Sequence, residues 1–396
     1  MGFFFTFEKI IFMKILKKIV FGFFAFIALL IALAYAFNYQ HLFNAIALTY
    51  LKGETSATID DGVDFPSRNI EKGVAQPWLK DSLYNKTSLP KNIVENLKST
   101  NSASFLVIKD GKLVHEEYFG EYKPTTQTNS FSMAKAITVL LMGLAIEDQK
   151  IQSENQKFAD FYPNFNKVEH GNELTLRDLA AMEAGYYWDE DYRNPFLQNP
   201  RIYYGKNMAE ALLKSPQFEA KPGSRFEYQS GATQLLGFAI RKAVNVPLSA
   251  YASQKLWKPL GMESDAYWNV DEDNKMEKTF CCINAIPRDY AKLGQLMLQK
   301  GNWNGKQLID STYIQKMITP TKNSGGIYGL GIWINNDTPY KYYHFWGFTS
   351  QLIIVIPEKN MVVVRTGKFN NEAKDDKGRS VQAAFLAENA VKTFAN

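Results

Sequence analysis

Residues 129–137 read NSFSMAKAI and place Ser132 and Lys135 three positions apart at the start of an apolar run. The run continues to Ile146 and predicts a buried helix, on which positions i and i+3 share a face. The hydroxyl and the amine can therefore meet. Burial lowers the pKa of a lysine, and such a lysine can deprotonate a serine. Free N–H groups at the helix start favour a developing oxyanion. The alternative is a helix cap followed by a solvated lysine.

The N-terminal segment predicts a membrane anchor. Lys14, Lys17 and Lys18 precede an uncharged run over residues 19–37, which is long enough to cross a hydrocarbon core at about 1.5 Å per residue. Lysines on the near side place that side in the cytoplasm. We therefore expect an inner-membrane anchor with the rest of the chain in the periplasm. The alternative is a cleaved signal peptide, which would release the chain to the periplasm.

Composition excludes several classes. The chain has 396 residues, of which 46% are hydrophobic, and this is enough for a large core. The net charge is +5, and the sequence has no basic stripe interleaved with aromatic residues, so we expect no nucleic-acid partner. The four histidines lack ligand spacing, and we expect no metal and no cofactor. Cys281 and Cys282 are adjacent, and because adjacent cysteines rarely bond each other we expect no disulfide framework.

The chain divides into three parts. We expect an anchor over residues 1–38, a linker and lead-in segment over residues 39–95, and one domain over residues 96–396. Within the domain, residues 104–108 and 113–118 predict a hairpin around Asp110-Gly111. Late strands are expected over residues 327–335, 340–346, 348–356 and 361–366, followed by a final helix over residues 381–394.

Helical patterns fill the middle of the chain. Thr175 predicts the cap of a helix that stops before Gly185, and Tyr187 and Trp188 follow as either a pocket wall or core filling. Tyr228 and Ser230 precede another long apolar helix. Strands at both ends with helices between them predict an α+β fold, in which an antiparallel sheet is flanked by helices and joined to a mostly helical region, after one N-terminal transmembrane helix.

Three motifs in order carry a family resemblance. Ser132-Met133-Ala134-Lys135, Tyr228-Gln229-Ser230 and Phe345-Trp346-Gly347 resemble the Ser-x-x-Lys, Tyr-x-Ser and Lys-Thr-Gly-like motifs of the serine β-lactamase and penicillin-binding-protein superfamily, in its class C branch. The resemblance covers roughly residues 95 to 396. Residues 280–285 and 347–351 resemble the 6-aminohexanoate-dimer hydrolase group within that branch.

The resemblance implies a serine hydrolase that cleaves a small-molecule amide or ester. Ser132 would form an acyl-enzyme, and Lys135 and Tyr228 would share its proton, with Lys135 supplying the charge that a tyrosine base needs. Ser230 and Gly347 would support the site, and the backbone N–H groups of Ser132 and Phe348 would form the oxyanion hole. The substrate pocket would include Tyr187, Trp188 and Trp346.

One departure limits the resemblance. Phe345 stands where the third motif has its lysine, and His344 would face the opposite side of the strand. Losing that cation argues against efficient β-lactamase activity, and Trp346 and Phe348 favour an apolar or linear amide or ester. An esterase, a D-amino-acid peptidase, a weak β-lactamase and a non-catalytic ligand-binding module remain the alternatives.

Overall fold

The central element is a six-stranded antiparallel sheet built from both ends of the domain. A computed structural model describes residues 2–192, 194–214 and 216–395. The sheet brings the first hairpin beside the last strands, as the sequence predicts. Its order is β3 (Lys112–Tyr118), β2 (Ser102–Lys109), β12 (Met361–Gly367), β11 (Gln351–Ile356), β10 (Tyr342–Gly347) and β9 (Trp333–Asn335).

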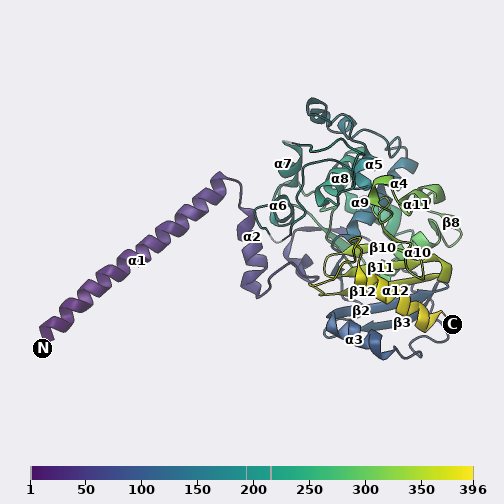
Figure 1. Cartoon of the computed structure of the whole chain (residues 1–396), viewed down its shortest axis with the longest axis horizontal. Coiled ribbons are helices and arrows are strands. Elements are labelled where there is room, and N and C mark those ends of the chain that lie inside the picture. Colours follow the sequence, from purple (N-terminus) through teal and green to yellow (C-terminus); the bar gives the residue numbers. More distant parts are fainter. Residues whose placement is uncertain (1, 193, 215, 396) are drawn as a thin grey trace.

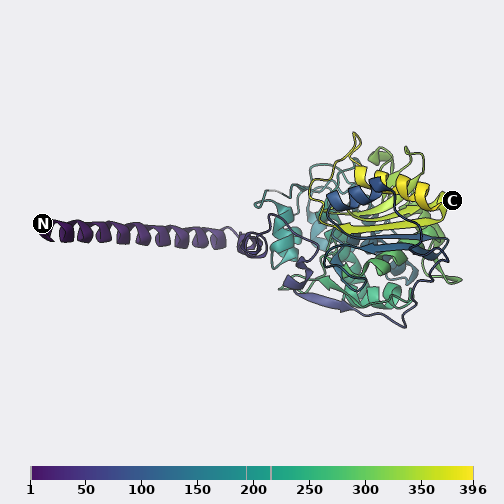
Figure 2. The same ribbon diagram turned by 90° about the horizontal axis from the view of Figure 1, so that it is seen from below.

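Helices cover both faces of this sheet because both faces are apolar. On one face α3 (Lys91–Ser99) and α12 (Val381–Phe394) pack over Phe105, Leu352 and Ile354. On the other face lie α4 (Met133–Glu147) and α10 (Pro287–Leu298) (Figure 2). The predicted α+β fold with its flanked antiparallel sheet is confirmed.

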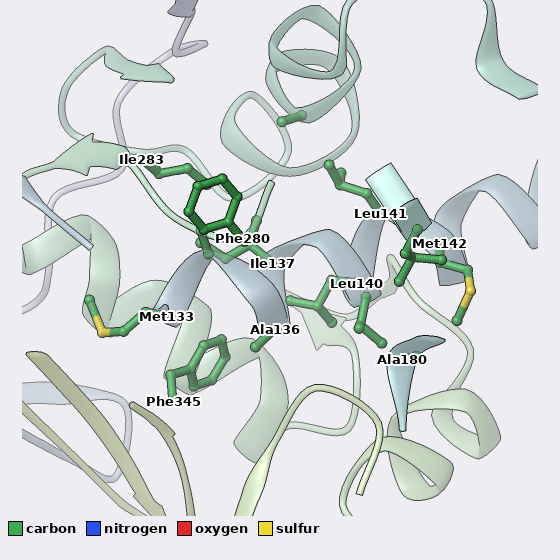
Figure 3. Packing of buried hydrophobic residues seen from close by; sticks show 14 of the residues in the cluster. Met133, Ala136, Ile137, Leu140, Leu141, Met142, Ala180, Phe280, Ile283 and Phe345 are labelled. Carbon is green, nitrogen blue, oxygen red and sulfur yellow. The ribbon is translucent and has the colours of Figure 1, made fainter. Parts of the chain in front are cut away.

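Helix α4 runs through the centre of the larger core. Thirteen of its 15 residues are buried, and Ile137, Leu140 and Leu141 face neighbouring elements on several sides (Figure 3). An all-round apolar sequence has no face to present to water, so the helix takes the middle of the domain. Helix α8 (Ser230–Val244) packs against α4, and α8 in turn contacts α5 (Leu176–Ala180), α6 (Gln198–Tyr204) and α9 (Leu248–Ala252), with α7 (Met208–Leu213) against α6. From α11 (Ser311–Met317), the Tyr313 hydroxyl donates to the carbonyl oxygen of Val139 in α4.

A smaller sheet holds the residues just before α4. Its order is β1 (Ser67–Ile70), β5 (Ala266–Asn269), β6 (Ile283–Ala285) and β4 (Thr128–Asn129), and a separate ribbon pairs β7 (Asn302–Trp303) with β8 (Lys306–Gln307). Since β1 belongs to the lead-in segment and pairs with β5, that segment is packed into the domain through its own strand.

The N-terminal helix α1 (Gly2–Ala36) extends away from the rest of the molecule, and α2 (His41–Leu48) follows it against α6 (Figure 1). Residues 11–36 of α1 are long and apolar enough to cross a membrane, by length and composition. The described side chains of this segment are almost all exposed. The core of the domain therefore does not account for their apolar character.

Two predicted strands are shorter in the structure. Residues 327–335 form a strand only at Trp333–Asn335, because Gly331 takes a φ of 72° and a β-carbon at Gly329 would lie 2.0 Å from the carbonyl oxygen of Met317. The strand predicted from Phe348 begins at Gln351. The pair Gly347–Gln351 closes a hairpin, and Thr349 and Ser350 turn the chain with φ values of 56° and 64°.

Candidate active site

Ser132 lies at a fixed turn immediately before α4. Its side chain makes no helix-capping hydrogen bond, so the alternative of a simple cap does not hold. Phe131, just before it, has a φ of 44°, a left-handed conformation that costs a non-glycine residue about 1–3 kcal/mol. Asn129 Oδ1 accepts from Phe131 N at 2.9 Å, and Ser130 N donates to Ile283 O at 2.7 Å. These bonds hold the turn that presents the Ser132 hydroxyl.

Lys135 is buried with its amine against the serine. The side chain is 1% exposed, and its Nζ lies 2.8 Å from Ser132 Oγ, 3.0 Å from Ser230 Oγ and 3.0 Å from the carbonyl oxygen of Phe280. Phe280 lies over the start of α4 in Figure 3. Burial lowers the pKa of Lys135 to about 8, against a smaller raising effect of the Glu190 carboxylate. A sizeable fraction of this lysine is therefore neutral in mildly alkaline solution.

Tyr228 lies on the other side of the serine. Its ring centre is 5.0 Å from Lys135 Nζ. Burial, with a contribution from the Glu190 charge, raises the pKa of Tyr228 above its ordinary value, although a hydrogen bond with Ser132 opposes this. A neutral lysine cannot stabilise a tyrosinate. In mildly alkaline solution the two pKa shifts therefore favour a neutral Lys135 beside a protonated Tyr228.

Glu190 is a site residue that the sequence analysis missed. Its Oε1 accepts from Ser230 Oγ at 2.6 Å and from the Tyr192 hydroxyl at 2.6 Å. Its Oε2 accepts from Ser230 N at 2.7 Å and from Trp188 Nε1 at 2.6 Å. The structure thus joins Lys135, Ser230 and Glu190 in one continuous hydrogen-bonded chain.

The third motif supplies no charged side chain, and its effect on the site comes from the sizes of its residues. Phe345 is 1% exposed and packs into the core beside Met133 (Figure 3), so no cation occupies its position. His344 faces the opposite side and is fully buried, with a pKa that burial lowers to about 3. A β-carbon at Gly347 would lie 2.2 Å from Ser130 O. Gly347 therefore lets β10 approach the turn that carries Ser132.

Two N–H groups near this contact are free. Among the hydrogen bonds of the described residues, neither Ser132 N nor Phe348 N has an acceptor. Ser132 N belongs to the turn before α4, and Phe348 N follows Gly347 at the end of β10. A pair of unused donors on two converging segments has the character of an oxyanion hole.

Aromatic rings line the site on two sides. Trp333 lies between Tyr228 and Trp346, with ring centres 5.3 Å and 5.0 Å away. In a second group, the ring centre of Phe348 is 5.5 Å from that of Phe131 and 5.7 Å from that of Tyr192. Trp333 was not predicted, because its short strand carries no pattern that marks it.

The two other predicted pocket residues lie elsewhere. Trp188 is 4% exposed and occupies the space beside Gly231, where a β-carbon would lie 2.4 Å from its ring. It therefore fills the interior behind Ser230. Tyr187 is 42% exposed, and among the contacts of the described residues none joins its side chain to Ser132, Lys135 or Tyr228. Trp346 is half-buried and donates through Nε1 to Glu372 Oε2 at 2.9 Å.

The premise that the adjacent Cys281 and Cys282 do not bond each other was wrong. Cys281 and Cys282 are joined to each other by a disulfide bond, with Cys282 at a φ of 74°. The bond closes a ring within one dipeptide, so it is not a framework linking distant segments. It directly follows Phe280, whose carbonyl oxygen holds Lys135. In the part of the chain that the structure describes, no group of three or more His, Cys, Asp or Glu side chains could hold a metal ion.

A family model and a bacterial relative match this chain. The family model described as "Beta-lactamase" matches residues 90–388. A protein of Escherichia coli K12 named "Putative D-alanyl-D-alanine carboxypeptidase" is 22% identical over 339 residues, which cover 66% of this chain and 77% of that protein.

Solved structures share the fold. One described as "Putative 6-aminohexanoate-dimer hydrolase from Bacillus anthracis" aligns with a TM-score of 0.69 at 21% identity, covering 83% of this chain and 90% of the other. A family VIII carboxylesterase aligns with a TM-score of 0.60 at 15% identity, covering 78% and 98%. At these identities the likeness shows the fold alone.

Proposed function

Because this chain belongs to the Beta-lactamase family and is a serine hydrolase of that fold, we propose that Ser132 attacks the carbonyl carbon of an amide or ester. The observation that carries the proposal is the 2.8 Å contact between Ser132 Oγ and the buried amine of Lys135. Lys135 takes the hydroxyl proton as the Oγ–C bond forms. The N–H groups of Ser132 and Phe348 stabilise the oxyanion.

Collapse of that intermediate needs an acid. Tyr228 gives its proton to the leaving amine or alcohol and is reprotonated from the Lys135 ammonium, which restores the neutral base. An acyl-enzyme on Ser132 remains. Water then attacks it with Lys135 again accepting the proton, and the acid product leaves as Ser132 Oγ regains a hydrogen.

The aromatic walls support a linear, largely apolar substrate. Trp346 and Phe348 are partly exposed and Tyr192 is exposed, so their rings can present apolar surface to a substrate. With Phe345 in the core, the third motif presents no side-chain cation to a substrate carboxylate. We therefore favour a linear amide of the kind named in the 6-aminohexanoate-dimer hydrolase, or an ester of similar shape.

A D-amino-acid peptidase is the second candidate, and one observation favours it. The amine of Lys374 lies 5.5 Å from the ring centre of Trp346, and Lys374 is exposed. A cation from this later segment could meet a substrate carboxylate near the third motif. The Escherichia coli relative is named for such an activity.

A substrate panel separates these readings. The purified protein would be assayed with a short nitrophenyl ester, an aminohexanoate dimer, an acyl-D-alanyl-D-alanine peptide and a chromogenic cephalosporin. We expect the ester and the linear amide to be cleaved and the cephalosporin to be cleaved poorly. Preference for the peptide, lost in Lys374→Ala, would replace the first candidate with the second. No turnover of any member, together with no labelling by a fluorophosphonate, would contradict the hydrolase mechanism.

The pH dependence follows from the two pKa shifts. Lys135 must be neutral to act as a base, and its pKa is lowered to about 8, so kcat/KM should rise about tenfold per pH unit below pH 8 and level off above it. Tyr228 must be protonated, and because its pKa is raised, no falling limb is expected below about pH 10. A bell-shaped profile centred near pH 7 would contradict this assignment.

We further propose that α1 anchors the protein in the inner membrane, with the hydrolase part in the periplasm. The support is the apolar segment 11–36 and the lysines that precede its uncharged part. We keep the division into an anchor, a lead-in over residues 39–95 and a hydrolase domain. A reporter that is active only in the periplasm, fused after residue 50, should give signal, and silence would overturn the placement.

A further inference from the structure

The direction of each hydrogen bond around Lys135 can be assigned from donor chemistry. The carbonyl oxygen of Phe280 only accepts, so Lys135 donates to it. An ionised Glu190 also only accepts, so the Ser230 hydroxyl donates to Glu190. The Ser230 oxygen is then left to accept from Lys135. Lys135 Nζ thus donates to two of its three partners, the Phe280 carbonyl oxygen and the Ser230 oxygen.

The third direction of the amine points at Ser132. A neutral amine has two N–H bonds and one lone pair, and the lone pair takes the direction that is left. That direction is the 2.8 Å contact with Ser132 Oγ. If Ser230 instead donated to Lys135, the lone pair would be occupied by Ser230 and an N–H would face Ser132. The base would then be turned away from the proton it must take.

We propose that Glu190 is a positioning residue that fixes the Ser230 hydroxyl as an acceptor and so aims the Lys135 lone pair at Ser132. The proposal rests on the function proposed above and extends it to a residue outside the three motifs. Glu190 is itself held in place, because Trp188 Nε1 and Ser230 N donate to one of its oxygens and the Tyr192 hydroxyl donates to the other. Among the hydrogen bonds of the described residues, none joins Glu190 to Ser132.

The charge of Glu190 gives the role a distinct signature. The carboxylate raises the pKa of Lys135, against the lowering by burial. Removing the charge therefore lowers the pKa of Lys135 further. The part of the pH profile over which kcat/KM rises, the rising limb, then moves to lower pH. Among the described residues, Tyr228, Tyr192 and Tyr328 are titratable groups near this cluster, and the pKa of each is raised, so these three stay neutral across the range tested.

The test is a double-mutant cycle read through the pH profile. In Glu190→Gln, the amide presents an N–H₂ group on one side, so it cannot accept from all four donors at once. We expect kcat/KM for a nitrophenyl ester to fall about tenfold or more at pH 8, with the limb moved to lower pH. Ser230→Ala removes the intermediary. Adding Glu190→Gln to Ser230→Ala should change kcat/KM by less than about threefold, because the two residues act in series.

Glu190→Asp separates position from charge. The shorter side chain keeps the charge but withdraws from Ser230, so the rate should fall while the limb stays close to that of the wild type. Glu227→Gln is the matched control. Glu227 directly precedes Tyr228 but pairs with Arg225 at 2.9 Å on the surface, so both rate and limb should stay at wild-type values.

Three outcomes would overturn the proposal. These are a Glu190→Gln limb unmoved from wild type, a rate within the range of the Glu227→Gln control, and losses for Glu190→Gln and Ser230→Ala that multiply in the double variant. Thermal unfolding of each variant identifies a folding failure, and in that case Glu190→Asp and its double variant with Ser230→Ala carry the double-mutant cycle, in which losses that multiply would again overturn the proposal. Fluorophosphonate labelling that survives Ser132→Ala would sink the proposed function itself, which is a different result.

Discussion

Replacing Ser132 with alanine is expected to abolish turnover of every substrate that the wild-type protein cleaves. Among the described residues, Lys135 Nζ has hydrogen bonds to the Ser132 hydroxyl, the Ser230 hydroxyl and the Phe280 carbonyl oxygen. The Phe280 carbonyl is not a nucleophile, and the Ser230 hydroxyl donates to Glu190, so Ser132 is the group expected to bond the carbonyl carbon. Loss of a serine nucleophile typically lowers kcat by about 10⁴-fold or more. Steady-state assay with a nitrophenyl ester measures this over the accessible range.

The fold should survive the change. Ser132 makes no capping hydrogen bond, so alanine removes only the contacts to Lys135 and Tyr228. The matched control is Ser99→Ala, an exposed serine at the end of α3, which should keep full activity. Ser132→Ala with more than a few per cent of wild-type activity and an unchanged melting temperature would show that another residue is the nucleophile.

Replacing Lys135 with methionine is expected to separate activity from stability. Methionine fills nearly the same volume but cannot take a proton, so kcat/KM should fall by about 10² to 10⁴-fold. The site keeps Ser132 and its oxyanion donors. The same substitution removes an amine that is 1% exposed and therefore poorly solvated.

The expected effect on stability follows from the linkage between proton binding and folding. The unperturbed pKa of a lysine is 10.5, and burial lowers the pKa of Lys135 to about 8 in the folded protein. Between pH 8 and pH 10.5 the unfolded chain binds more protons than the folded protein, so the free energy of unfolding rises with pH. Below pH 8 both states hold the proton, and burial of the charged amine lowers the free energy of unfolding by its full amount, about 3 kcal/mol. Lys135→Met removes this penalty but also loses the hydrogen bonds of the amine.

Thermal unfolding from pH 7 to pH 10 tests this directly. We expect the melting temperature of Lys135→Met to match or exceed that of the wild type at pH 7, with a difference that declines as pH rises toward 10. The control is Lys316→Met, at an exposed lysine paired with Glu154, for which no such pH-dependent gain is expected. The lowered pKa would be contradicted if Lys135→Met melted below the wild type at pH 7 and the difference in melting temperature disappeared by pH 10.

The sequence predicted those parts of the site that depend on local spacing. Ser132 and Lys135 meet because they lie one turn apart at the start of a helix, and the apolar run that follows them forms the buried helix α4 that its pattern predicts. Thr175 caps α5 as expected, with Asp178 completing a capping box. The sheet could be predicted because alternating and β-branched segments at both ends of the domain have no other way to pair.

The remaining parts depend on contacts between distant segments. Glu190 lies in an irregular loop and reaches Ser230 across 40 positions of sequence, so no periodicity marks it. Trp333 acquires its place only when β9 pairs with β10. Thr349 and Ser350 lie in a segment whose pattern predicts a strand, and neither residue is a glycine, yet both are left-handed. Arg365 donates to the carbonyl oxygens of both and holds this turn from the neighbouring strands.

Mass-spectrometric mapping of the adduct formed with a fluorophosphonate tests the central claim most directly. The reagent phosphonylates an activated serine, and digestion locates the modified side chain. The account predicts a single adduct on Ser132, formed faster as pH rises toward 8 and lost in Ser132→Ala. An adduct on a different residue, or equal labelling of Lys135→Met and wild type at pH 8, would contradict it.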